Sequence, residues 1–367
     1  MSQVDGAHGM SQVDGAHGMS QVDGAHGMSQ VISAQEAIQQ LRDGKVVAIP
    51  TETVYGLAAS AGHPDALASI YTLKGRPKDN PMILHGASVE QLLPFVEGWS
   101  QVHQACADAF WPGPLTLILR ASKRVPSIVT AGLDTVAIRI PNHPLALEIL
   151  EHTGPLAAPS ANLSGSPSAT KASHVVDDFG DAVAVVDGDQ AAIGLESTVV
   201  WAAGNEEGNE MDNGAGSEWR VLRPGVIGAD EIGDVAGVVV AGVSRQKDNE
   251  APISPGTKYR HYTPKAQVRW LDVETAKALE ELGQGTTLQL ITLTKETNLW
   301  AKALQKRRST LNHLHANSFQ ELAVNLYKWF RWADHHQNEC IYIESFTPSS
   351  PLEESIHNRV NKAIITP

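Results

Sequence analysis

The order of apolar and polar positions from Val31 onward predicts alternating helices and strands. Residues 34–45 (AQEAIQQLRDGK) place apolar side chains at helical spacing and run into Gly44, a frequent helix end. Residues 46–51 (VVAIPT) are typical of a buried strand, and residues 64–75 (PDALASIYTLKG) start with proline and stop at glycine, as many helices do. The same signals predict strands at 114–119, 135–140, 182–187 and 197–202, and helices at 143–154 and 171–179. This alternation predicts a mixed sheet flanked by helices.

The chain divides into four parts on this pattern. Residues 1–30 repeat the nonapeptide MSQVDGAHG, have no apolar face to bury, and are predicted to be disordered. Residues 31–240 carry the pattern above, interrupted by the acidic segment 204–218, which is typical of a solvated insertion. Residues 241–265 form a polar linker that ends in SPGTKYRHYTP. A second alternation within 266–367 predicts a smaller α/β domain, with strands at 266–271, 287–293 and 340–345 and helices at 273–282 and 318–336.

Composition and charge narrow the function classes. The 367 residues carry a formal net charge of -13, which argues against a whole surface that binds nucleic acid or an anionic membrane. Any binding of an anion must therefore be local. Cys106 and Cys340 are far apart and lie outside any C-x-x-C motif, which argues against a disulfide framework or a zinc ribbon and favours the reducing cytoplasm. No apolar run is long enough to predict a membrane span.

Two polar loops offer groups that bind phosphate. The stretch KGRPKDNP (74–81) brings three cations together, and its prolines prevent a regular helix or strand from continuing. The guanidinium of Arg76 suits bidentate contact with phosphate, whereas a solvated turn is the alternative interpretation. The stretch APSANLSGSPSAT (158–170) offers hydroxyls, an amide and backbone N–H groups between a predicted strand and a predicted helix, a setting that can bind phosphate. A flexible linker is the alternative for this second loop.

Other polar residues follow or interrupt predicted strands. Thr51 and Thr53 come directly after a buried strand, where open α/β sheets place ligands, although an ordinary turn would look the same. Arg139 lies inside an apolar strand and needs an anionic partner, which can be a substrate or a structural carboxylate. Ser197 and Arg223 are further candidates near strand ends, whereas a lone histidine such as His85 is more often structural than catalytic.

The sequence contains no P-loop, no G-x-G-x-x-G after a strand, no H-E-x-x-H and no G-x-S-x-G. Paired carboxylates and a Ser-His-Asp order are not evident either, so a hydrolase is not indicated. Lys, Arg, Ser, Thr and Asn side chains suit phosphoryl chemistry by positioning and charge neutralisation. We expect Mg²⁺ to arrive with the nucleotide and expect no metal-ligating residues.

In this order, PTETVYGL, KGRPKDNP, FWPGPLTLIL, DTVAIRIPNHP, APSANLSG, GLESTVV and LRPG closely resemble the YrdC-like family of threonylcarbamoyl-AMP synthases. The resemblance runs from about Val31 to Val240, and SPGTKYRHYTP with the following domain resembles the long form of that family. It implies an α/β fold with an open twisted mixed sheet, flanking helices and a basic cleft, plus a smaller C-terminal Rossmann-like domain. It also implies a nucleotidyltransferase that forms threonylcarbamoyl-AMP and pyrophosphate from L-threonine, bicarbonate or CO₂, and ATP.

The resemblance also implies roles for individual residues. The family's K-x-R and S-x-N signatures fall on four residues expected to form the catalytic set around the phosphates: Lys74, Arg76, Ser160 and Asn162. Contacts with ATP are expected from Arg76, Asn80, Thr135, Ala158, Asn162, Thr170, Arg223 and Tyr262. Contacts with threonine are expected from Thr53, His85, Arg139, Ser160 and Ser197, with Arg139 pairing the carboxylate.

The implied product is passed to a tRNA threonylcarbamoyl transferase, and a weak contact with tRNA itself is left open. The segment SPGTKYRHYTP is expected to act as a lid, with Tyr262 preferred to Tyr259 as the nucleotide contact; tyrosines that only pack the domain interface are the alternative. Two other functions are disfavoured. An RNA-binding module without catalysis is disfavoured by the charge of -13, and a carbamoyl transferase of the hydrogenase-maturation type by the lack of zinc-binding cysteine pairs.

Overall fold

The computed structural model describes residues 30–202, 219–242, 262–281 and 285–364. Predictions for the N-terminal repeats, for the acidic segment and for most of the linker lie outside the described residues. Tyr262 is described, whereas Tyr259 is not.

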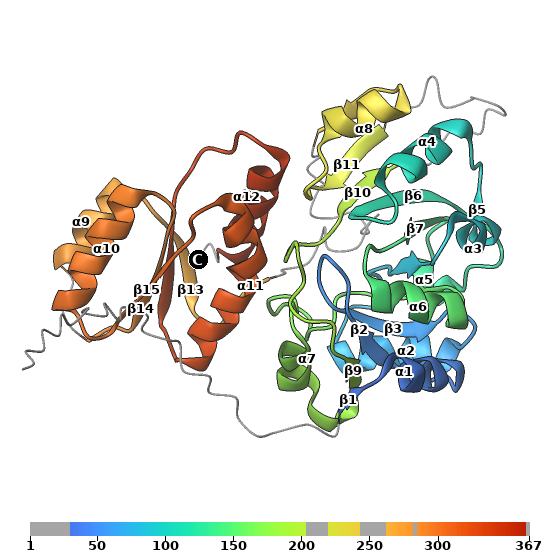
Figure 1. Ribbon diagram of the computed structural model, residues 1–367, viewed down its shortest axis with the longest axis horizontal. Coiled ribbons are helices and arrows are strands. Elements are labelled where there is room, and N and C mark those ends of the chain that lie inside the picture. Colours follow the sequence, from blue (N-terminus) through green and yellow to red (C-terminus); the bar gives the residue numbers. More distant parts are fainter. Residues whose placement is uncertain (1–29, 203–218, 243–261, 282–284, 365–367) are drawn as a thin grey trace, which may run out of the picture.

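The first domain is built on one large mixed sheet with helices packed against it (Figure 1). Within the described residues its strand order is β1-β9-β2-β3-β8-β4-β7-β6-β10-β11-β12, and β5 pairs with β6 beside this path. It contains both parallel pairs, such as β4 with β7, and antiparallel pairs, such as β6 with β7. The predicted mixed, open sheet is therefore confirmed.

The strands are β1 (Val31–Ile32), β2 (Val47–Ile49), β3 (Gly56–Ser60), β4 (Ile83–His85), β5 (Val96–Glu97), β6 (Leu115–Ala121), β7 (Thr135–Arg139), β8 (Leu156–Ala157), β9 (Ala184–Val186), β10 (Thr198–Trp201), β11 (Trp219–Arg223) and β12 (Val240–Ala241). The α-helices are α1 (Ala34–Arg42), α2 (Pro64–Lys74), α3 (Val89–Leu92), α4 (Gln101–Phe110), α5 (Ser127–Thr130), α6 (Pro144–Thr153), α7 (Ala172–Phe179) and α8 (Ala229–Ala236). Two 3₁₀ turns are η1 (Leu93–Phe95) and η2 (Gly180–Ala182).

Local signals explain where the first helices begin and end. Ser33 and Glu36 form a capping box at the start of α1, which satisfies backbone N–H groups that have no partner within the helix. Helix α2 starts at Pro64 and ends before Gly75, which adopts φ 59°. Because glycine has no Cβ, it takes this left-handed conformation readily, and the chain can turn directly into the cationic loop.

The second domain is a parallel sheet between two helical layers. Its strands run in the order β13-β16-β14-β15, and they are β13 (Gln267–Leu271), β14 (Leu288–Thr292), β15 (Leu311–His315) and β16 (Cys340–Glu344). One layer contains α9 (Val273–Glu281) and α10 (Lys295–Arg307), and the other contains α11 (Phe319–His335) and α12 (Pro351–Ala363). The prediction of a separate α/β domain is confirmed, but α10 and β15 were not anticipated.

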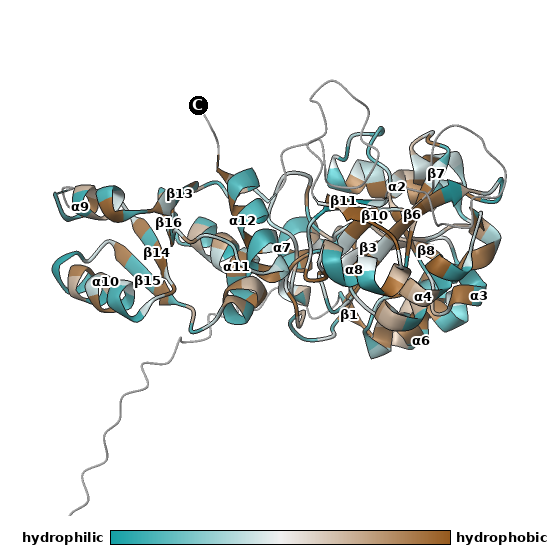
Figure 2. Ribbon diagram, turned by 90° about the horizontal axis from the view of Figure 1, so that it is seen from above, coloured by the Kyte–Doolittle hydropathy of each residue, from teal (hydrophilic) through white to brown (hydrophobic). Residues whose placement is uncertain are grey.

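The apolar core continues across the domain boundary. Val54 and Leu195 of the first domain belong to the same buried cluster as Leu326 and Val360 of the second. Figure 2 shows hydrophobic residues concentrated on the strands, while the helices carry hydrophilic residues as well. None of the helices among the described residues has the length and apolar character needed to cross a membrane.

Candidate active site

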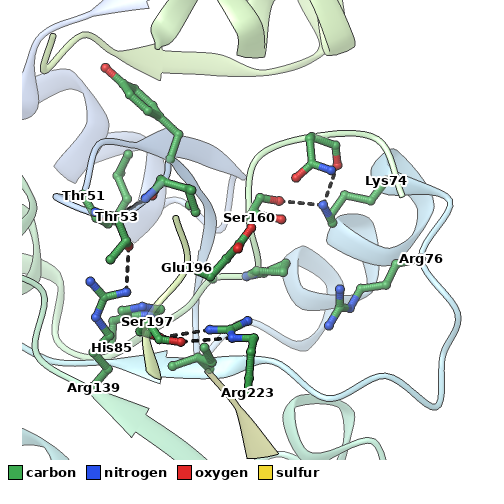
Figure 3. A pocket seen from close by; sticks show the side chains of 18 of the residues that line it. Thr51, Thr53, Lys74, Arg76, His85, Arg139, Ser160, Glu196, Ser197 and Arg223 are labelled. Atoms are coloured by element: carbon green, nitrogen blue, oxygen red, sulfur yellow. Dashed lines mark hydrogen bonds between the residues drawn. The ribbon is translucent and has the colours of Figure 1, made fainter. Parts of the chain in front are cut away.

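A cavity opens where loops from several strands of the first domain converge (Figure 3). The space between its walls is about 790 Å³, a volume that includes open solvent at its mouth. Its wall is formed by the loops after β2 and β8, the end of α2, the ends of β4, β7 and β11, and the turn before β10. Four cations line it against one acid: Lys74, Arg76, Arg139 and Arg223 against Glu196. The chain is acidic as a whole, yet this cavity is locally basic.

Lys74 fastens the loop after β8. Its Nζ donates hydrogen bonds to the backbone carbonyls of Ser160, at 2.6 Å, and of Asn162, and its own carbonyl accepts from the N–H of Ser164 at 2.8 Å. An ammonium group has three donors, so one N–H remains for a ligand. Burial, reinforced by the nearby charge of Arg76, holds the pKa of Lys74 well below its ordinary value.

Arg76 closes the cationic loop on itself. Its Nε donates to the carbonyl of Asn80 at 3.2 Å, and its Nη2 donates to the carbonyl of Pro81 at 2.6 Å. These contacts explain why the loop is stiff as well as charged, and they leave other guanidinium N–H groups for a ligand. Burial lowers the pKa of Arg76 to about 10, so the side chain stays protonated near neutral pH. Lys78 of the same loop is exposed.

Arg139 is paired with a carboxylate of the protein itself, that of Glu52. Its Nη2 lies 2.7 Å from Oε1 of Glu52, its Nη1 donates to the hydroxyl of Thr53 at 2.9 Å, and its Nε donates to the carbonyl of Gly113 at 3.0 Å. The structural carboxylate is therefore present. The contact with Glu52 lacks the alignment of a hydrogen bond, and neither oxygen of Glu52 makes a hydrogen bond within the described residues. Nη2 of Arg139 therefore keeps a hydrogen-bond donor for a well-aligned acceptor.

Ser197 and Arg223 are held together at the opposite wall. Arg223 donates through Nε to the Ser197 carbonyl and through Nη2 to the Ser197 hydroxyl, both at 3.0 Å, and Figure 3 shows these two contacts as dashed lines. The same hydroxyl lies 2.7 Å from that of Thr116. Burial lowers the pKa of Arg223. Burial therefore disfavours the charged forms of Lys74, Arg76 and Arg223, so an anionic ligand in the cavity would stabilise all three.

His85 is a neutral group in this cavity. Burial and the nearby charge of Arg139 lower its pKa to about 3, so the imidazole is uncharged near neutral pH. Its Nδ1 makes no hydrogen bond within the described residues, although the side chain is only 5% exposed. Such a ring nitrogen is suited to a ligand contact and not to charge neutralisation.

Most residues singled out from the sequence come together in this cavity. Those in its wall are Thr53, Lys74, Arg76, His85, Arg139, Ala158, Ser160, Asn162, Ser197, Arg223 and Tyr262. Three others are buried outside the cavity lining: Asn80, Thr135 and Thr170. The Asn80 carbonyl holds Arg76, and the Thr170 N–H donates to His174 at 3.2 Å, so both support neighbouring loops. Their predicted contacts with ATP stay predictions, as do the assigned roles of the wall residues.

Sequence reasoning missed two acids of the site, Glu52 and Glu196. Each lies one position before a predicted threonine contact, Thr53 or Ser197, and each is buried. A single acid beside a hydroxyl residue within a largely apolar stretch was the available signal. Among the described residues no cluster of three or more His, Cys, Asp or Glu side chains is placed to hold a metal ion.

Comparison with known proteins identifies both domains. Residues 39–214 match the Sua5/YciO/YrdC family model, described as "Telomere recombination", and residues 227–364 match the model "Threonylcarbamoyl-AMP synthase, C-terminal domain". The second match begins before the linker predicted at 241–265, so it also includes helix α8 of the first domain and strand β12 of its sheet.

Relatives match along nearly the whole chain. The threonylcarbamoyl-AMP synthase of Bacillus subtilis is 39% identical over 338 residues, covering 89% of this chain and 92% of the relative. That of Pyrococcus abyssi is 37% identical over 330 residues, covering 88% and 91%. The crystal structure of P. abyssi Sua5 complexed with L-threonine has a TM-score of 0.76 at 35% identity and covers 90% of this chain and 93% of that one. The chain therefore belongs to the two-domain, or long-form, branch of the YrdC/Sua5 family of threonylcarbamoyl-AMP synthases.

Proposed function

We propose that this protein is a nucleotidyltransferase that makes threonylcarbamoyl-AMP and pyrophosphate from L-threonine, CO₂ or bicarbonate, and ATP. The observation that carries this proposal is the convergence of four buried or half-buried cations with hydroxyl and amide groups in one cavity. Family membership supplies the reaction, and the threonine bound to P. abyssi Sua5 supports threonine as the amino acid. A positively charged, partly dehydrated site suits a polyphosphate because charge–charge attraction is stronger there than in water.

The wall offers two chemically different regions for the two substrates. Threonine is assigned to Arg139, Thr53, His85 and Ser197, where Nη2 of Arg139, which makes no hydrogen bond to Glu52, pairs with the substrate carboxylate. The phosphates are assigned to the region of Lys74, Arg76 and Asn162, where Arg76 keeps guanidinium N–H groups and Lys74 keeps one ammonium N–H for a ligand.

The chemistry then depends on positioning. The threonine amine adds to the carbon of CO₂ and loses a proton, which gives a carbamate. A carbamate oxygen attacks the α-phosphorus in line, a new P–O bond forms, and the bond from the α-phosphorus to the bridging oxygen breaks. Pyrophosphate leaves with the electron pair, while Arg76 and Lys74 neutralise charge that builds on the phosphates. No covalent bond to the protein is required.

We propose that Mg²⁺ enters with ATP. The two acids nearest the cavity, Glu52 and Glu196, are paired with arginines, so the described donor set does not fit a resident Mg²⁺, which favours carboxylate ligands. No step is assigned to the metal. The product is expected to pass to a tRNA threonylcarbamoyl transferase in the cytoplasm, a setting that suits two free cysteines, and tRNA contact with this chain is expected to be weak.

The direct test supplies purified protein with Mg·ATP, L-threonine and labelled bicarbonate. The expected products are pyrophosphate and a labelled adenylate, both dependent on threonine. An unchanged yield without threonine would contradict the assignment. Strongly salt-dependent RNA binding without ATP consumption would instead favour the RNA-binding alternative.

A further inference from the structure

The second domain anchors loops that form the cavity. Arg331 of α11 pairs with Asp178 at 2.7 Å and donates to the carbonyl of Pro167 at 2.6 Å, close to the loop that Lys74 fastens. The N–H of Thr263, in the linker, donates to the carbonyl of Gly165 in that loop at 2.8 Å. The wall is therefore supported from outside the first domain.

Glu196 is the wall residue most dependent on this support. Its Oε1 accepts from the hydroxyl of Ser168 at 2.6 Å, and its Oε2 accepts from the hydroxyl of Tyr327 at 3.0 Å and from Nε of Arg359 at 2.9 Å. Tyr327 belongs to α11 and Arg359 to α12. A buried carboxylate without such partners would be strongly destabilised, so Glu196 is tolerated here because the second domain is in place.

Arg359 bridges the neighbours of two site residues. Its Nε contacts Glu196, which precedes Ser197, and its Nη1 donates to the carbonyl of Pro224, which follows Arg223, at 2.8 Å. The guanidinium is completely buried and also lies over the ring of Tyr262, at 5.4 Å from its centroid. One side chain of the second domain thus holds both ends of the Ser197–Arg223 pair.

The two bridged segments already lie very close together. A Cβ at Gly225 would come within 2.3 Å of the backbone nitrogen of Thr198, so a side chain cannot fit between them. In such a tightly packed arrangement, the position of the Arg223 guanidinium depends on how the segments are held. Ser355 of α12 donates to the same Pro224 carbonyl at 3.3 Å, which adds a second contact from this helix.

We propose that Arg359 is a positioning residue for the reaction and sets the Ser197–Arg223 pair from the second domain, through Glu196 and the Pro224 carbonyl. Arg359 is not part of the cavity wall and is assigned no contact with substrate. The inference rests on the proposed function because it assumes that Ser197 and Arg223 bind the substrates. The planar guanidinium of Arg359 reaches both acceptors at once, whereas a lysine ammonium can replace only part of this bridge.

The test compares steady-state pyrophosphate release by wild-type, Arg359→Met and Arg359→Lys, each well below its unfolding temperature. The control is Gln190→Ala: Gln190 also donates across the domain boundary, to the carbonyl of Val324 at 3.0 Å, and does not line the cavity. We expect Arg359→Met to lower kcat/KM for ATP at least about tenfold, Arg359→Lys to recover part of this, and Gln190→Ala to stay within about twofold.

A double-mutant cycle separates positioning from a general loss of stability. If Arg359 acts through Arg223, Arg359→Met should cost less than about threefold in an Arg223→Met background. An equal cost in both backgrounds, or near wild-type kinetics for Arg359→Met, would overturn the proposal. Should Arg359→Met fail to fold, Arg359→Lys and Glu196→Gln are judged by the same criterion.

Failure of the proposed function gives a different result. A wild-type protein that forms no adenylate would refute that function, and calorimetric ATP affinity then decides the positioning role. Weaker ATP binding by Arg359→Met than by wild-type would support the role, and equal binding would overturn it. An active wild-type with unaffected Arg359 variants would overturn the positioning role alone.

Discussion

Replacing Lys74 by methionine should loosen the loop after β8 and weaken the whole first domain. Methionine keeps most of the length of the side chain but removes the donor to the carbonyls of Ser160 and Asn162. Each buried acceptor left without a partner costs about 1 to 3 kcal/mol, and the contact at Ser160 is only partly buried. Lys74 is 3% exposed, so solvent screening does not reduce the effect. Removing a cation that burial disfavours recovers part of this cost, so we expect a net loss of about 1 to 3 kcal/mol in unfolding free energy.

The assay is urea unfolding followed by circular dichroism, together with KM for ATP in the pyrophosphate-release reaction. Lys78→Met is the matched control because Lys78 has the same charge, lies in the same loop and is exposed. The control should change stability by less than about 0.5 kcal/mol. If Lys74→Met unfolds at the same urea concentration as Lys78→Met, the Lys74 ammonium does not hold the loop and the reasoning is refuted.

Three further predictions concern charge and burial. Arg76→Ala should lower kcat/KM for ATP by about tenfold or more, because charge-assisted contacts are typically worth about 1.5 to 3 kcal/mol. Wild-type kinetics for this variant would instead favour the interpretation of the loop as a solvated turn without a role in binding. Burial acts to raise the pKa of Glu196, but the charges of Arg359 and Arg223 more than offset it and lower the pKa to about 2. The ionised Glu196 therefore contributes its full stabilisation above the ordinary pKa of 4.5, and this contribution is lost as the pH falls toward 2. Unfolding measured across this range should therefore be less pH-dependent for Glu196→Gln than for wild-type, and an identical dependence would count against the pairing. Burial raises the pKa of the Cys106 thiol to about 11. A thiol reagent near neutral pH should therefore modify half-buried Cys340 first and reach Cys106 only after unfolding. Equal rates of modification of the two cysteines in the folded protein would contradict this packing.

Local sequence was sufficient for elements whose signals are themselves local. Helices α1 and α2 follow from capping residues, proline and glycine, and the apolar runs of β6 and β7 identify them as strands. Helix α10 was missed because KETNLWAKALQKR is mostly polar, and β15 because LNHLH has no continuous apolar run. Their packing against the second sheet comes from partners elsewhere in the chain, which a local pattern does not contain.

Some features of the cavity could be predicted from the sequence, and others depend on the tertiary structure. Sequence alone determined which loops carry the hydroxyls, amides and cations, and it indicated that Arg139 needs an anionic partner. Only the tertiary structure showed that Glu52 is that partner and that Arg359, separated from Glu196 by 163 positions, holds the opposite wall from another domain. A buried charge requires a counter-charge, but it does not specify where in the chain that charge stands; the fold decides this when it brings distant segments together in a region of low dielectric constant.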